Sequence, residues 1–235
     1  MNHTIYLSSL ADKRLTEYLT DNGFTPQLLD GGGSPVYKEV STHADIHMCQ
    51  LGLWENSRIF PGNMEKLGNN YPGNIIYNAV CTGKYFIHNL KYTDSELLTA
   101  AEKWQRKVNP STELKKLHVS QGYTRCCCLP VDDSSFITSD EGIAHTLEDT
   151  DADVLLIKKG SIALSGFDYG FIGGCSGHLI LCGKRTIVFN GDLQAHPDYK
   201  KIAAFIKDRD IDIISFTGYP LTDIGSILRG LPYHK

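Results

Sequence analysis

The chain repeats one order of apolar runs, polar turns and amphipathic segments. Apolar runs begin at residues 85 (YFIHN), 136 (FITSD) and 186 (TIVFN), about 50 residues apart. Each follows another apolar run and a tight polar turn, which is typical of a β-hairpin. A polar cap, a helical segment (residues 94–106, 140–148 and 197–208) and a third apolar run come next. The pattern predicts a repeated unit of strand, hairpin, strand, helix and strand.

Two weaker copies extend the pattern to both ends of the chain. Residues 45–62 predict a further hairpin, and residues 4–29 predict strand, helix and strand with no strand before them. Residues 224–230 could supply that missing strand. A period of this length is typical of propellers, solenoids and arrays, and joined termini favour a ring without open sheet edges. We therefore expect an α/β fold with one domain over residues 1–235, a closed five-fold ββαβ propeller around a central channel.

The composition is that of an ordinary soluble protein. Of 235 residues, 41% are hydrophobic and 21% are charged, and the formal net charge is −4. No basic stripe stands out, so nucleic acid is not expected as a partner, and no apolar run approaches the length of a membrane span. The first residues lack the apolar run of a signal peptide, so we expect a cytoplasmic protein. The sequence leaves the oligomeric state open.

Seven cysteines are present. An odd number of cysteines, in a chain without a predicted secretory signal, favours reduced thiols. We interpret Cys126, Cys127 and Cys128 as packing residues on a strand, which cannot turn three sulfurs to one zinc. We expect no metal and no cofactor. Cys175 stands apart because it lies in the glycine-rich stretch FIGGCSGH at residues 171–178. There it is either a nucleophile on an exposed turn or a small residue where backbones approach closely.

Six segments carry a resemblance to a known family. They are residues 42–52 (THADIHMCQLG), 71–94, 121–144, 166–177 (GFDYGFIGGCSG), 189–198 and 220–226 (PLTDIGS). They resemble an uncharacterised bacterial family, mainly clostridial, with the pentein fold of the guanidino-modifying enzymes. The resemblance implies a ring of five ββαβ units. In pentein enzymes such as arginine deiminase, a cysteine attacks the guanidinium carbon, a histidine is the acid and base, and carboxylates hold the planar cation.

By this resemblance Cys175 is the candidate nucleophile, and His196 or His43 is the candidate acid and base. In a closed ring, turns at corresponding ends of the units would face the channel and bring such groups together. The candidates for substrate binding are Asp45, Asp168, Tyr169, Asp198, Arg125 and Asn78. In the deiminases the nucleophilic cysteine lies in the last unit, whereas Cys175 lies in the fourth, so ordinary deiminase activity is not expected.

Most candidates also have a purely structural interpretation. His196 and Asp198 suit the start of a helix, where aspartate is favoured. His43 and Asp45 suit hydrogen bonding at the entry to a strand, and Asn78 suits hydrogen bonding to the backbone. The sequence leaves these alternatives open.

Two functional hypotheses follow. The first is an uncharacterised hydrolase or transferase that acts on a small guanidino- or amine-bearing molecule in the central channel. The second is a non-catalytic binding module, like the ribosome anti-association factor, which is also a pentein. A nucleotide-binding turn is disfavoured, because residues 171–178 match neither G-x-G-x-x-G nor the P-loop.

Overall fold

A computed structural model describes residues 4–233 as a mixed α/β structure. Its helices are α1 (Lys13–Asp21), α2 (Ala44–His47), α3 (Ser95–Val108), α4 (Thr124–Cys127), α5 (Glu141–Glu148) and α6 (Tyr199–Lys207), with 3-10 turns at Lys38–Val40, Met64–Lys66 and Leu193–Ala195. Its strands are β1 (Thr4–Ser8), β2 (Thr25–Leu29), β3 (Met48–Leu51), β4 (Arg58–Pro61), β5 (Val80–Cys81), β6 (Tyr85–His88), β7 (Lys115–His118), β8 (Cys128–Pro130), β9 (Ser135–Thr138), β10 (Asp153–Leu156), β11 (Ser176–Leu181), β12 (Lys184–Phe189), β13 (Asp212–Ile214), β14 (Leu228–Arg229) and β15 (Leu231–Pro232). Every helix within residues 4–233 is too short or too polar to span a lipid bilayer.

The repeated unit predicted from the sequence is confirmed in the second half of the chain. An antiparallel hairpin, a helix and a parallel strand follow one another in β8–β9–α5–β10 and again in β11–β12–α6–β13. The set β5–β6–α3–β7 has the same order. β14 pairs antiparallel with β1, placing Arg229 opposite Ile5, so residues 224–230 do complete the first unit.

The prediction of a closed five-unit propeller is wrong. The strands form separate sheets with the orders β14-β1-β2, β10-β9-β8, β11-β12-β13 and β15-β4-β3-β5-β6-β7, and within residues 4–233 no closed ring of units forms. Parallel pairing of Leu51 with Cys81 joins β3 to β5, which merges two hairpins into one six-stranded sheet. The period of a sequence reports the local unit, whereas pairing between units depends on contacts that the period does not encode.

Two segments predicted as strand entries are helical turns instead. Ala44–His47 and Thr124–Cys127 form α2 and α4, and only Cys128 of the cysteine triplet begins a strand. Every residue of both turns is buried. A fully buried segment shows no difference between its faces, and periodicity then loses its meaning.

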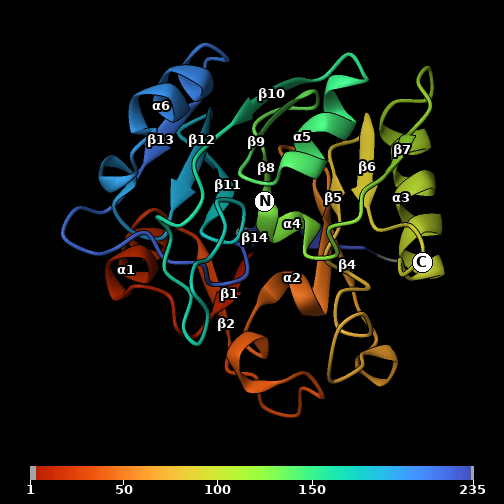
Figure 1. The fold of residues 1–235 in the computed structure, drawn as a ribbon, viewed down its shortest axis with the longest axis horizontal. Helices are drawn as coiled ribbons and strands as arrows, with labels where there is room; N and C mark the ends of the chain where they lie inside the picture. Colours follow the sequence, from red (N-terminus) through yellow and green to blue (C-terminus); the bar gives the residue numbers. More distant parts are fainter. Residues whose placement is uncertain (1–3, 234–235) are drawn as a thin grey trace.

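The longer helices cover the sheets with apolar faces. Asp94 begins α3 by accepting hydrogen bonds from the backbone N–H groups of Glu96 and Leu97, which satisfies the free end of the helix. Leu97 and Trp104 then pack into the core beneath it. Figure 1 shows α1, α3 and α6 toward the outside of the molecule and α2 and α4 near its middle.

The segments that precede the first strand of each hairpin meet beside α2 and α4. The N–H of Asp45 donates to the carbonyl of Gly225 at 3.1 Å, and that of Gly174 donates to the carbonyl of Cys126 at 2.9 Å. The N–H of Ser226 donates in turn to the carbonyl of Gly174 at 2.7 Å. These bonds hold residues that are far apart in the sequence in one buried cluster.

Candidate functional site

A cavity of about 330 Å³, here called the thiol cavity, opens beside this cluster. Its walls are largely aromatic, and its polar lining includes His43, Cys126 and Asp223. The aromatic side chains are Tyr37, Tyr123, Phe167, Tyr169 and Phe171. An apolar enclosure with a few converging polar groups is the usual form of a small-molecule site.

His43, Cys126 and Asp223 bring three kinds of reactive group together. One imidazole nitrogen, the thiol sulfur and one carboxylate oxygen all lie within 4.8 Å of one another. His43 directly precedes α2, Cys126 lies in α4, and Asp223 lies in the loop before β14. All three side chains are at least 96% buried, at 4%, 3% and 4% relative exposure. Their position therefore depends on the meeting of three segments that the sequence separates widely.

Hydrogen bonds hold the thiol of Cys126 in place. It donates to Oδ2 of Asp45 at 3.0 Å, and Nδ2 of Asn78 donates to its sulfur at 3.4 Å. The hydroxyl of Ser226 donates to the same Asp45 oxygen at 2.5 Å. Burial raises the pKa of Cys126 well above its ordinary value, and the nearby carboxylates of Asp45 and Asp223 raise it further. The thiol is therefore protonated at neutral pH while the cavity holds no cation.

Asp223 is held by two backbone N–H groups. Gly225 donates to its Oδ1 at 2.9 Å and Phe171 to its Oδ2 at 3.0 Å. Burial raises the pKa of Asp223 to about 6, although the neighbouring His43 and the two N–H donors oppose the change. This carboxyl group consequently exchanges its proton in the range in which an imidazole ordinarily does.

The imidazole of His43 is positioned by packing. Within residues 4–233 no hydrogen bond engages either of its ring nitrogens, although the side chain is buried. Gly225 lies against it with a φ of +70°, and a Cβ atom there would fall 2.1 Å from Cβ of His43. Only glycine combines that backbone conformation with so close an approach. The ring is thus confined while its nitrogens stay free to bind.

Arg125 and Asn78 lie directly behind the thiol and have structural partners. The buried Arg125 guanidinium donates from Nη1 to the carbonyl of Gly173 at 2.9 Å and from Nη2 to that of Ser176 at 3.3 Å. Oδ1 of Asn78 accepts the backbone N–H of Arg125 at 2.8 Å. The guanidinium charge is therefore directed toward backbone carbonyls and away from the cavity contacts of Cys126.

The other candidate residues that the sequence suggested lie in different surroundings. Asp168 and Tyr169 line the thiol cavity, with Asp168 exposed. Cys175 is fully buried in an apolar cluster, its thiol donates to the carbonyl of Ile172 at 3.3 Å, and burial raises its pKa well above the ordinary value. Cys175 does not line the cavity.

His196 and Asp198 lie at the start of α6, and neither lines the thiol cavity. Nδ1 of His196 accepts the backbone N–H of Asp198 at 3.1 Å. Oδ2 of Asp198 accepts the backbone N–H of Lys158 at 2.7 Å, which lowers the pKa of Asp198. Asp198 is the N-cap residue of α6, but its side chain makes no capping hydrogen bond with the helix and holds the backbone of Lys158 instead.

Sequence reasoning missed Cys126 and Asp223 as site residues. A signal for Cys126, but not for Asp223, was present in the repeat itself. Asp45, Asn78, Cys126 and Ser226 each stand two or three residues before β3, β5, β8 and β14, whereas Gly174 takes this position before β11. Aligned on these strands, the first four positions carry polar or thiol side chains, and three hydrogen bonds join them.

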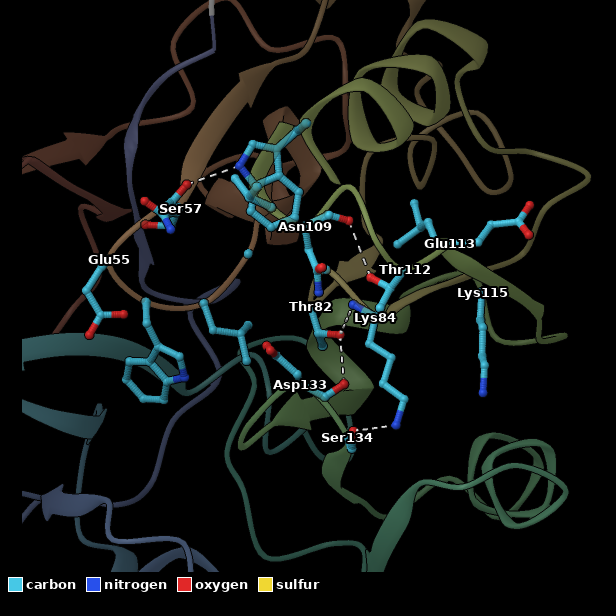
Figure 2. A pocket seen from close by; sticks show the side chains of 18 of the residues that line it. Glu55, Ser57, Thr82, Lys84, Asn109, Thr112, Glu113, Lys115, Asp133 and Ser134 are labelled. Atoms are coloured by element: carbon cyan, nitrogen blue, oxygen red, sulfur yellow. Dashed lines mark hydrogen bonds between the residues drawn. The ribbon is translucent and has the colours of Figure 1, made fainter. Parts of the chain in front are cut away.

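A larger hollow of about 980 Å³, here called the hairpin groove, lies at the hairpin turns. Figure 2 shows Lys84 donating to Ser134, and Thr82 bonded to Asp133 on the neighbouring turn. Its basic side chains are paired: Lys84 and Lys115 with Asp151, Lys116 with Glu102, and Arg185 with Glu55. Of the described residues that line it, none is a cysteine or a histidine.

Comparison with known proteins places the chain in one family. Residues 55–228 match the Family of unknown function (DUF6873). Cys126 and Asp223 lie inside the matched region, whereas His43 and Asp45 precede it. No curated protein matches the chain. Because the match covers most of its length, the chain belongs to the family of unknown function DUF6873.

Proposed function

We propose that the thiol cavity binds a small guanidino- or amine-bearing molecule and that the protein is a hydrolase or transferase acting on it. The observation that carries the proposal is the approach of His43, Cys126 and Asp223 to within 4.8 Å inside a cavity with aromatic walls. A thiol, an imidazole and a carboxyl group supply a nucleophile, a proton carrier and a charge partner.

The charges around the cavity favour a cationic ligand. The carboxyl groups of Asp45 and Asp223 are both buried beside the thiol, where the buried guanidinium of Arg125 offsets the charge of Asp45 in part. Tyr123 and Phe171 line the cavity, and aromatic rings attract a flat organic cation that lies over their faces. A bound cation would offset the carboxylate charge and so lower the pKa of the Cys126 thiol.

The groups then have distinct tasks. The Cys126 thiol passes its proton to His43, and its sulfur attacks the electron-poor carbon of the bound guanidinium, forming a C–S bond. The C–N bond of the leaving amine breaks, and His43 passes the same proton to that amine. Water or a second amine, deprotonated by His43, then displaces the sulfur and restores the thiol. Water gives hydrolysis and an amine gives group transfer.

A reduced thiol is required for this chemistry. All seven cysteines are free. We therefore propose that the protein acts in a reducing compartment such as the cytoplasm.

Binding without catalysis is the second candidate. The observation that favours it is the raised pKa of Cys126, whose thiol donates a hydrogen bond to a buried carboxylate and is a weak nucleophile in that state. A cavity of this kind would recognise a cation and leave it unchanged.

Alkylation by iodoacetamide with peptide mapping tests the proposal. In the metal-free protein, arginine, agmatine or a simple alkylamine at millimolar concentration should change the alkylation rate of Cys126 and leave that of Cys182 unchanged. Release of amine from the same compounds, followed by mass spectrometry, should disappear in Cys126→Ser and persist in Cys175→Ser. Loss of turnover only in Cys175→Ser would reject Cys126 as the nucleophile and favour the sequence-based assignment of Cys175. Binding without turnover would favour the second candidate.

A further inference from the structure

We propose that His43, Cys126 and Asp223 form a binding site for a divalent transition-metal ion, zinc above all. This metal site would be a property of the protein itself and does not depend on the small-molecule chemistry proposed for the thiol cavity. One consequence rests on the proposed function: a metal held by the Cys126 sulfur blocks the thiol and so regulates the site.

The three ligand atoms nearly have the spacing that zinc requires. Zinc lies about 2.3 Å from a thiolate sulfur and about 2.1 Å from an imidazole nitrogen or carboxylate oxygen, so its ligand atoms lie roughly 3.3 to 3.8 Å apart. In this protein the corresponding atoms lie within 4.8 Å of one another. Metal binding would draw these atoms together by about 1 Å.

The free imidazole of His43 is a second and independent indication. The side chain is 96% buried at 4% relative exposure, it lines the cavity, and within residues 4–233 no hydrogen bond engages its nitrogens. Its nitrogens are therefore available to a ligand in the cavity, and a metal ion would bind one of them on the side from which Cys126 and Asp223 approach.

An outer shell of hydrogen bonds orients two of the ligands. The amide of Asn78 donates to the sulfur of Cys126, a bond that a thiolate keeps, whereas the bond from the thiol to Asp45 is lost when a metal ion replaces the proton. The two backbone N–H donors described above hold the carboxylate of Asp223. Oδ1 of Asp45 is buried without a partner, so the shell carries one further acceptor. Such outer contacts set the direction and basicity of metal ligands.

The charges and the open side of the site also agree with a divalent ion. A thiolate, a carboxylate and a neutral imidazole together balance a charge of about +2. The sulfur–metal bond replaces the S–H bond, and the released proton passes to solvent without any change of oxidation state. Three protein ligands leave a fourth position, which the thiol cavity leaves open to water or a small molecule.

Titration with cobalt(II) tests the site directly, because a cobalt–thiolate bond gives a charge-transfer absorption in the near ultraviolet. The full chain, first treated with a chelator, should bind one cobalt ion and show this band, and zinc should abolish it. The band should be lost in Cys126→Ser and retained in Cys182→Ser, which removes the exposed thiol. Absence of the band in the unaltered protein, or its persistence in Cys126→Ser, would overturn the proposal.

A second variant keeps the test decisive if Cys126→Ser fails to fold. His43→Gln removes an imidazole that has no hydrogen bond to lose, so the fold should persist by circular dichroism. It should weaken zinc binding at least about tenfold. Unchanged affinity in folded His43→Gln would reject the site. Alkylation of Cys126 in chelator, with and without the guanidino compounds, separately tests the proposed function.

Discussion

The thiol cavity and the hairpin groove differ in the chemistry of the polar groups that line them. The groove has about three times the volume, 980 against 330 Å³, yet its cations are paired with carboxylates near the surface. The cavity is smaller, but it brings an imidazole next to a protonated thiol and a carboxyl group with a raised pKa. Converging reactive groups with shifted pKa values indicate function better than the size of a cavity does.

The largest expected effect comes from adding a side chain at Gly225, which packs against His43. Gly225→Ala adds a Cβ atom 2.1 Å from that of His43 at a φ of +70°, so both strain and overlap oppose folding. We expect a loss of about 4 kcal/mol in the free energy of unfolding, measured with urea. Gly83→Ala in the hairpin groove is the matched control, because its φ of +103° also strains an alanine but its Cβ would come no closer than 3.2 Å to Trp104. Equal losses in the two variants would contradict the comparison.

The next effect is a dependence of stability on pH that Asp223 causes. Its pKa is raised from the ordinary 3.8 to about 6, so the folded state binds the extra proton between these values. The contribution of protonated Asp223 to the free energy of unfolding is fully present below about pH 4. As pH rises through about 6 this contribution is lost, and the loss amounts to about 3 kcal/mol at most. Asp223→Asn should remove this slope in urea unfolding measured from pH 4 to 8. A slope unchanged in the variant would assign the dependence to other groups.

The sequence predicted the hairpin units because their signals are local. Polar turns and alternating runs such as residues 85–89 and 186–190 specify hairpins wherever the chain lies. The joining of β3 to β5 and the absence of a closed ring within residues 4–233 depend on contacts between units. No local pattern encodes those contacts.

The site was predicted in part for the same reason. His43 and Asp45 were found as polar residues at the start of a hairpin, but Cys126 resembled an apolar residue within a cysteine triplet. The glycines around Cys175 reflect close packing, since that thiol is fully buried. Asp45 and Cys126 lie 81 residues apart in the sequence. The pairing of this thiol with a carboxylate can therefore be recognised only in the folded structure, where the two segments meet.

Removing the carboxylate behind the thiol gives the third effect. Asp45→Ala leaves the buried thiol of Cys126 without its acceptor, whereas the hydroxyl of Ser226 keeps a second acceptor, the carbonyl of Gly173 at 3.2 Å. An unsatisfied buried donor costs about 1 to 3 kcal/mol, so we expect a loss near 2 kcal/mol in urea unfolding. Ser226→Ala removes its own hydroxyl but leaves Cys126 bonded to Asp45, so it should cost less. An equal or larger loss in Ser226→Ala would contradict the expectation that the unpaired thiol dominates the effect.

The smallest effect is expected in the hairpin groove. Lys84 pairs with Asp151 at 2.6 Å, but Asp151 is exposed and Lys115 approaches the same carboxylate at 2.8 Å. Lys84→Ala should therefore cost less than about 1 kcal/mol, because solvent screens the pair and a second cation remains. The loss should shrink further when salt is raised, whereas that in Asp45→Ala should not, since its contacts are buried. A salt-independent loss above about 2 kcal/mol in Lys84→Ala would show that the groove, too, depends on a desolvated charge.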